Sequence, residues 1–202
     1  TISTNWLYKF YGAADNYYAW AKIDETSSLL AGEGFTMKGT GGAAVIPIST
    51  LQNYVFKGLP NNGDILLPLD KTSGDVDRLI GNPYPSAIDA TEFILDNISV
   101  TEGGNNATGT VINGALYFWD HFGQANSHVL KEYVGGYATR NLTGGAAAIS
   151  NDIRINNDMT TGTKVPGQYI SVNQGFFVST VLETNPNDNG GTIASVTGGN
   201  II

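Results

Sequence analysis

Two stretches, ALYFWDHF (residues 115–122) and GFFVSTVLE (175–183), decide the fold class of this chain. Both are rich in aromatic and β-branched residues and are flanked by turn-forming residues, as is typical of short β-strands. Strands at this spacing predict an all-β fold, a β-sandwich with a jelly-roll-like arrangement. Four further runs have the same character: YYAWAKI (17–23), GFTMKG (34–39), NYVFKG (53–58) and GQYISV (167–172).

The composition agrees with that fold class. The chain has 202 residues, of which 41% are hydrophobic and 26 are glycine. This length suffices for one domain with a sizeable core, and glycine favours turns over helices. One short helix is predicted near 87–97, because Asp89 and Glu92 lie where the helix dipole favours acids and apolar residues follow at helical spacing.

The predicted organisation is a single sandwich-type domain over residues 1–183. The remaining residues, 184–202, contain few large apolar side chains and are predicted to form a linker or a flexible C-terminal tail. The domain also shows signs of two related β-units, about 1–58 and 78–183.

The evidence for these units is an internal echo in the sequence. LLAGEGFTMKG (29–39) and ISVNQGFFVST (170–180) align without a gap. Chance similarity between glycine-rich strands is the alternative explanation. The segments ahead of them also match in order: WLYKF and YYAWA (6–10, 17–21), then LYFWDHF and GYATR (116–122, 136–140).

The most distinctive stretch is RLIGNPYPSAIDATEF (78–93). Its two prolines fix their own backbone angles and push the residues before them into extended geometry. Either Ser86 or Asp89 is then placed to cap the short helix. The structural motif consists of Asn82, Pro83, Tyr84, Pro85 and Ser86.

This stretch resembles a motif of large secreted and surface-anchored proteins of the Bacteroidetes that are exported by the type IX secretion system. The resemblance covers about residues 29 to 182. It implies an extracellular or outer cell-surface location, and it implies little about activity because such regions adjoin many different effector modules. The C-terminal sorting domain that usually follows is not recognisable here. The matching parts, in order, are Gly34-Phe35, Phe56 through Gly63, Gly81 through Asp89, Leu116 through Asp120 and Gln174 through Val178.

Charge and cysteine content exclude several functions. The net charge of -8 argues against nucleic acid as a partner, since few cations are available for the phosphates. The absence of cysteine excludes disulfides and thiolate zinc sites. No apolar run approaches the roughly 18 residues that cross a bilayer, so we expect no membrane insertion. The chain starts without a recognisable leader, and we expect a mature product or a fragment of a longer protein.

Catalytic and metal sites are weakly signalled. Asp120, His121 and His128 suggest a metal site, but neighbouring residues of a strand point to opposite faces. We therefore expect Asp120 to end its strand in a turn and the histidines to be solvated. Ser86 lacks the Gly-x-Ser-x-Gly elbow of a nucleophile, and no acid pair suggests glycoside hydrolysis, so no catalytic residue is predicted. Structural Ca²⁺ is the one cofactor considered, with loop acids as weak candidates: Asp70, Asp75 and Asp77.

Aromatic residues near the N-terminus are the remaining lead. Rings that stay exposed can stack on sugar faces, whereas alternate rings along a strand would instead fill the core. The candidate binding platform is Trp6, Tyr8, Tyr18 and Trp20.

These observations predict a non-catalytic extracellular module, part of an adhesin or of a structural, filament-forming protein of the cell surface. Its expected partners are neighbouring modules of a larger chain or identical subunits, with edge strands such as 170–183 pairing between chains. The alternative is a carbohydrate-binding module attached to a secreted enzyme, with polysaccharide as its ligand.

Overall fold

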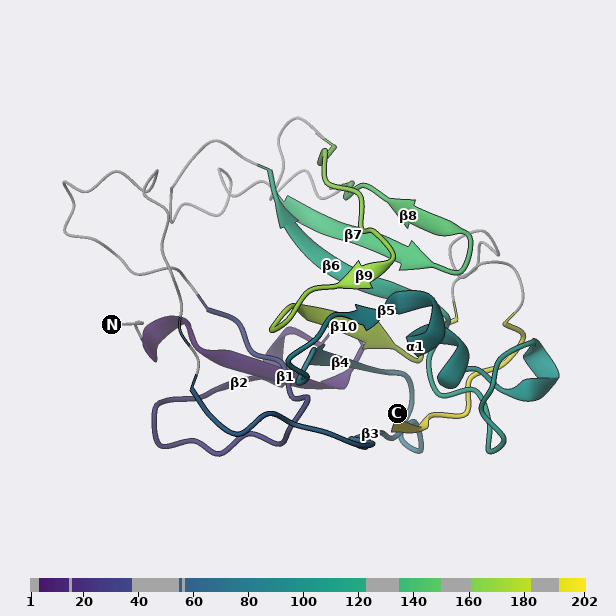
Figure 1. Cartoon of the computed structure of the whole chain (residues 1–202), viewed down its shortest axis with the longest axis horizontal. Helices are drawn as coiled ribbons and strands as arrows, with labels where there is room; N and C mark the ends of the chain where they lie inside the picture. The colour runs from purple at the N-terminus through teal and green to yellow at the C-terminus, as the bar shows by residue number, and fades with distance from the viewer. Residues whose placement is uncertain are drawn as a thin grey trace.

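The computed structural model describes residues 4–14, 16–37, 55, 57–122, 135–149, 161–182 and 193–202. These residues form one seven-stranded antiparallel sheet, two two-stranded sheets and one α-helix (Figure 1). The predicted all-β class is confirmed. The layer facing the large sheet is built from the helix and the two small sheets.

The large sheet has the strand order β2-β1-β4-β10-β6-β7-β8. Its strands are β1 (Tyr8–Ala13), β2 (Trp20–Lys22), β4 (Val76–Gly81), β6 (Leu116–His121), β7 (Gly135–Asn141), β8 (Gly144–Ala146) and β10 (Gly175–Ser179). The small sheets pair β3 (Leu67–Leu69) with β11 (Gly199–Ile201), and β5 (Ile88–Asp89) with β9 (Tyr169–Ile170). The helix is α1 (Ala90–Asp96), and short 3₁₀ turns are η1 (Thr4–Trp6), η2 (Tyr17–Ala19) and η3 (Val100–Glu102).

The hydrophobic core lies between α1 and the face of the large sheet that we call the helix face. Phe176 of β10 is its centre, with its ring edge-on to Phe93 of α1 at 5.6 Å and stacked on Phe118 of β6 at 5.4 Å. Ile80 and Ile94 are also buried in this cluster. Apolar burial on this one face accounts for the alternation of buried and exposed residues along the strands.

Helix α1 forms where the sequence predicts it. Of the two candidate caps, Asp89 performs the role, since its carboxylate accepts a hydrogen bond from the Thr91 N–H at 2.9 Å. Gln168 also donates to this carboxylate at 2.7 Å. Burial opposes ionisation of Asp89, but the Gln168 and backbone hydrogen bonds prevail and lower its pKa. The N-terminal end of α1 is therefore hydrogen-bonded to Gln168, the residue before β9.

The strand predictions have mixed outcomes. The runs at 115–122 and 175–183 contain β6 and β10, as expected. Residues 17–19 form η2 instead of a strand, because the Asn16 side chain accepts from the Tyr18 N–H and starts a 3₁₀ turn. Only two residues of 167–172 pair, as β9. In 34–39 the described part forms an isolated bridge. Half of 53–58 lies outside the described residues, and the described residues 55, 57 and 58 belong to no strand.

Strand β4 lies next to the middle of the large sheet although its sequence is not purely apolar. Arg78 is buried there, and its guanidinium is 3.1 Å from the Glu33 carboxylate and 4.4 Å from the centre of the Tyr11 ring. Burial opposes ionisation of Glu33, yet the Leu30 N–H and the charges of Lys9 and Arg78 lower its pKa. A partnered charge can thus occupy a buried strand position.

The predicted linker over 184–202 is wrong for the residues that the structure describes, 193–202. Ile193, Val196 and Ile201 are buried in the core, and β11 pairs with β3. Glu102 holds the start of the segment by accepting hydrogen bonds from the N–H groups of Ala194 and Ser195 at 2.8 and 3.0 Å. The segment alternates small polar residues with single isoleucines and valines, so its low hydrophobicity concealed a packed strand.

The two echoing segments, 29–39 and 170–180, lie on opposite sides of β4. Each contains a turn closed by a backbone hydrogen bond, from Glu33 to Leu30 at 3.0 Å and from Gln174 to Ser171 at 3.1 Å. The third residue of each turn has a positive φ: Gly32 at 85° and Asn173 at 60°. Ile80 of β4 contacts both segments: Glu33, the last residue of the first turn, bridges it on one side, and Phe176, two residues beyond the second turn, pairs with it on the other.

The strands ahead of these turns also correspond in register. Tyr8 bridges Thr36 as Tyr117 pairs with Phe177, and these partners occupy equivalent positions in the aligned segments. The next strand pair also corresponds if YYAWA (17–21) is shifted by two residues against GYATR (136–140), so that Trp20 aligns with Tyr137. Phe10 then pairs with Trp20 as Trp119 pairs with Tyr137.

Candidate functional site

The face of the large sheet opposite α1 carries a cluster of rings from five strands. We call this surface the aromatic face, and it comprises Phe10, Trp20, Trp119, Tyr137 and Phe177. Two edge-to-face pairs flank a central ring: Phe10 with Trp20 at 5.0 Å and 70°, and Trp119 with Tyr137 at 5.2 Å and 70°. Phe177 contacts both pairs, at 5.4 Å from Phe10 and 5.6 Å from Tyr137.

The two pairs differ in exposure. Phe10 is buried near the β2 edge of the sheet. Trp119 and Tyr137 lie on adjacent strands near the β8 edge, where they are 46% and 41% exposed. Burial of the hydroxyl and the charge of Asp77 raise the pKa of Tyr137 to about 12. Tyr137 therefore stays neutral and can take part in apolar contacts throughout the ordinary pH range.

The predicted platform is distributed over several places. Trp20 belongs to the aromatic face, and alternation along β1 places Tyr8 on the same side as Phe10. Tyr18 is 93% exposed on η2 and pairs with Tyr17 at 6.3 Å. Trp6 lies in η1, before β1. The pairing of Trp119 with Tyr137 was missed because it requires the register of β6 with β7.

The motif around Asn82 has a structural role. Asn82 is buried, and its side-chain amide donates to the carbonyl oxygens of Ser86, Ile170 and Ser171 at 2.8 to 3.2 Å. Its side-chain oxygen accepts from the Tyr84 N–H at 2.9 Å. One side chain thus fixes the turn after β4 and joins it to the β9 region.

A second part of the resemblance meets this turn. The Tyr84 hydroxyl donates to the carbonyl oxygen of Gly63 at 2.8 Å, and the Asn61 amide donates to that of Pro83 at 2.9 Å. Pro85 and Ser86 are exposed. The 56–63 and 81–89 parts of the resemblance are therefore in contact in the fold, and packing between them is a structural reason for both to be present.

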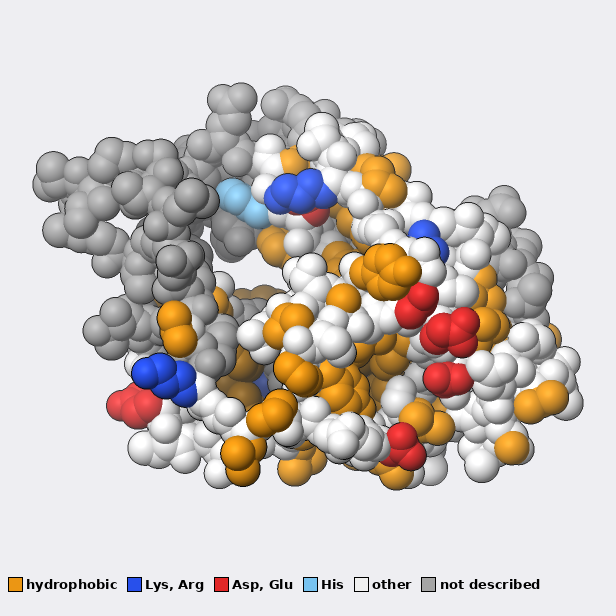
Figure 2. Space-filling model, viewed as in Figure 1, with side chains coloured by type: hydrophobic (Ala, Val, Ile, Leu, Met, Phe, Trp, Pro, Cys, Tyr) orange, Lys and Arg blue, Asp and Glu red, His pale blue; other side chains and the backbone are white. Residues whose placement is uncertain are grey.

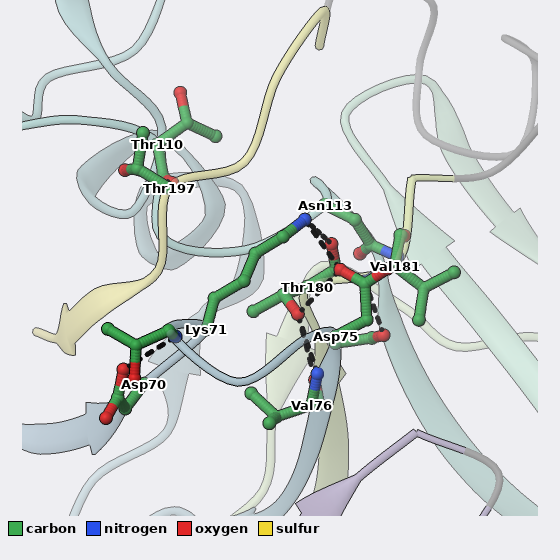
Figure 3. A network of polar contacts seen from close by, with 11 residues as sticks. Asp70, Lys71, Asp75, Val76, Thr110, Asn113, Thr180, Val181 and Thr197 are labelled. Carbon is green, nitrogen blue, oxygen red and sulfur yellow. Dashed lines mark hydrogen bonds and ion pairs between the residues drawn. The ribbon is translucent and has the colours of Figure 1, made fainter.

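The calcium candidates do not converge. Asp75 is paired with Lys71 at 2.6 Å, and the Lys71 ammonium also donates to the Thr180 carbonyl oxygen at 3.3 Å (Figure 3). Asp70 turns away from them in Figure 3 and accepts from the Thr72 N–H at 2.9 Å. Asp77 lies within β4. Among the described residues, no group of three His, Cys, Asp or Glu side chains is arranged to hold a metal ion.

A groove runs beside α1 and the Asn82 turn. Its volume is about 260 Å³, with an apolar floor that includes Ile80, Phe93 and Phe176. Figure 2 shows the apolar patch next to acidic side chains over α1. Two of the acids at its rim already hold partners, since Asp89 caps the helix and Asp96 accepts from Asn105 at 2.9 Å.

The expected position of Asp120 is wrong. Asp120 lies inside β6, pairs with Gly136 and is only 4% exposed. The strand continues past Asp120 because β7 pairs with it as far as His121. His128 lies outside the described residues. The predicted strand 115–122 includes Asp120, but adjacent polar Asp and His side chains favour a turn in the sequence, and only the pairing with β7 shows that the strand continues.

A β-rich domain with one large antiparallel sheet and an aromatic face is the class that this geometry defines. The chain matches a family described as a domain of unknown function (DUF8693) over residues 1–190, and it belongs to that family. No curated protein and no solved structure matches the chain. None of the described helices has the length and apolar character needed to cross a membrane.

Proposed function

We propose that the chain is a non-catalytic module of an extracellular surface protein, an adhesin or a structural protein, and that its aromatic face makes the contacts. The observation that carries this proposal is the pair Trp119 and Tyr137, two large rings nearly half exposed on adjacent strands. Aromatic side chains give large contact areas with little loss of conformational entropy. Contiguous exposed apolar surface marks interaction sites.

The partner that fits best is another module or a second copy of the chain. The rings of Trp119 and Tyr137 stand at 70° to each other, so both cannot lie flat against one sugar ring or one planar polysaccharide surface. A protein side chain can fill the angle between them. This geometry favours a protein partner over the alternative of a carbohydrate-binding platform on this face.

The contact does not use strand 170–183 as an edge. Strand β10 lies between β4 and β6 and is paired on both sides. The described strands at the two ends of the large sheet are β2 and β8. An interface through the aromatic face is consistent with this topology, whereas sheet extension through β10 is excluded.

Light scattering on a size-exclusion column tests the contact between identical subunits. We expect a mass above the monomer's 21.4 kDa for the wild type and a shift toward the monomer for Trp119→Ala and Tyr137→Ala. Tyr18→Ala is the matched control, because it removes an even more exposed ring outside the aromatic face. A wild type that is monomeric at all concentrations would contradict self-association, and equal effects of all three variants would contradict the assignment to this face.

A further inference from the structure

Asp120 carries a buried carboxylate that its packing among the described residues leaves largely unsatisfied. It points to the helix face, away from the aromatic face, and neither of its oxygens has a hydrogen-bond partner among the described residues. One charge partner exists: the Lys164 ammonium lies 3.0 Å from Oδ1, on a side chain that is 78% exposed. A carboxylate has about four lone-pair sites. Lys164 can occupy only one of them, and leaving the others empty in a buried position is costly.

Local packing restricts which groups can approach the Asp120 oxygens and donate hydrogen bonds to them. Gly162 is buried beside it, and a Cβ on that residue would come within 2.6 Å of Oδ2. The backbone of Gly162 is itself fixed by a hydrogen bond of 2.8 Å from its N–H to the Ala148 carbonyl oxygen. The chain therefore approaches Asp120 closely on one side.

A cavity of about 280 Å³ opens next to Asp120. Its walls come from β6, from Ala138 of β7 and from the segment that runs from Lys164 to Ser171, and Gln174 also contributes. The Gln174 amide nitrogen donates to the Gly175 carbonyl at 2.9 Å, so its side-chain oxygen remains as an acceptor. Tyr169 adds a ring that is 66% exposed. The cavity thus combines a buried acceptor, a cation, an amide and an aromatic ring.

These groups select the chemistry of a ligand. Lys164 already neutralises the carboxylate, which disfavours a metal ion, because a divalent cation would be repelled by the ammonium. The unmet need is for neutral hydrogen-bond donors. Neighbouring hydroxyl groups supply such donors in pairs, and the C–H face of a pyranose packs well on an aromatic ring.

We propose that this cavity binds one pyranose unit of a glycan. Both Asp120 oxygens have almost no accessible surface, so the exposed Lys164 side chain moves aside and a ligand hydroxyl donates to Oδ1 in its place. Lys164 donates to a ligand oxygen, and Tyr169 packs against the sugar ring. The cavity volume limits the ligand to a single unit at the low end of the usual range for small-molecule sites. The site lies on the helix face of the sheet, although Trp119 of the aromatic face also borders the cavity, and it does not depend on the function proposed for the aromatic face.

Saturation-transfer NMR with the methyl glycosides of glucose, galactose and mannose tests the proposal. We expect transfer to at least one of them in the wild type, and a loss of affinity of at least about tenfold in Asp120→Asn, as for a hydrogen bond to a charged acceptor. Tyr169→Ala removes an exposed ring without touching the core and is expected to weaken binding as well. Asp64→Asn is the matched control, since this exposed acid lies outside the cavity.

Three outcomes would overturn the proposal. The first is that no glycoside binds the wild type at about 10 mM, a concentration that detects even millimolar affinity. The second is unchanged binding by folded Asp120→Asn and Tyr169→Ala. The third is stabilisation of the wild type by Ca²⁺ that Asp120→Asn abolishes, which would assign the cavity to a metal ion. Tyr137→Ala separates the two sites, because it is expected to affect self-association and to leave glycoside binding unchanged.

Discussion

Individual polar side chains hold distant segments of this chain together. Asn97 is fully buried and exchanges two hydrogen bonds with the backbone of Ile202, at 3.1 and 3.2 Å. Asn82 performs the same task for the turn after β4. Such side chains tolerate little change, because their loss leaves buried backbone groups without partners.

Replacing Asn82 should reveal this role directly. We expect Asn82→Ala to lower the free energy of unfolding by about 3 kcal/mol, because several buried backbone groups lose their partner. Ser86→Ala lies in the same motif and should change it by less than about 0.5 kcal/mol, since this side chain is exposed. Urea denaturation measures both, and equal losses would contradict the structural role assigned to Asn82.

Glu102 makes the attachment of residues 193–202 dependent on pH. Burial opposes ionisation of this carboxylate, but hydrogen bonds from Thr110, Ala194, Ser195 and Ser99 prevail and lower its pKa below the ordinary 4.5. The stabilisation is therefore complete above about pH 4.5 and is lost as the pH falls through the lower value of the folded state.

The variant Glu102→Gln tests this dependence. At pH 7 we expect it to be less stable than the wild type by about 2 kcal/mol, as for hydrogen bonds to a charged acceptor. The difference should shrink as the pH falls below about 4.5. Thermal unfolding across a pH series is the measurement, and a difference that stays constant would show that ionisation of Glu102 is not responsible.

At the scale of elements, the two turns beside β4 show that sequence similarity predicts a shared backbone geometry but not shared packing. Their shared backbone geometry follows from residues that allow a positive φ, Gly32 and Asn173, and was visible as an echo. Their surroundings differ. A Cβ on Gly34 would lie 2.5 Å from the Ile80 carbonyl oxygen, whereas one on Gly175 would lie 3.6 Å from the same atom.

These two glycines form a matched pair of variants. Gly34→Ala is expected to cost about 2 to 3 kcal/mol, because the backbone of β4 must shift to admit the methyl group. Gly175→Ala meets only ordinary contacts and should change the stability by much less. Equilibrium unfolding compares them, and similar costs would mean that the two sides of β4 are equally crowded.

Sequence reasoning recovered the elements with one dominant signal. Alternating aromatic residues identified β6 and β10, and an acid at the right position identified the cap of α1. It failed where a strand depends on distant partners. Strand β4 needs Glu33 and Tyr11 to accommodate Arg78, and no local pattern reports those contacts.

At the scale of the whole molecule, the two faces of the large sheet differ in how they are covered. Helix α1 and the small sheets bury the helix face, and the described residues leave Trp119 and Tyr137 partly exposed on the other. The sequence predicts which residue types could form a site, but it does not predict which of these residues lie together. The aromatic face and the Asp120 cavity each unite residues more than 40 positions apart, and only the strand order brings them together.

The last described residues test whether the domain extends beyond residue 190. Ile201 is buried in the core, while its neighbour Ile202 is 47% exposed. We expect Ile201→Ala to cost about 2 to 4 kcal/mol in unfolding free energy and Ile202→Ala to cost far less. Differential scanning calorimetry measures both. Two near-silent substitutions would restore the view of this segment as a linker.

The position of β11 also determines when the chain can fold. Strand β3 finds its partner only after about 130 more residues have been made, so the pairing is among the most non-local in the domain. Because synthesis starts at the N-terminus, the chain cannot complete its core until residues 193–202 have been made. Until then, β3 lacks its partner and the core lacks the side chains of Ile193, Val196 and Ile201, so a chaperone can bind the apolar surface that this segment later covers.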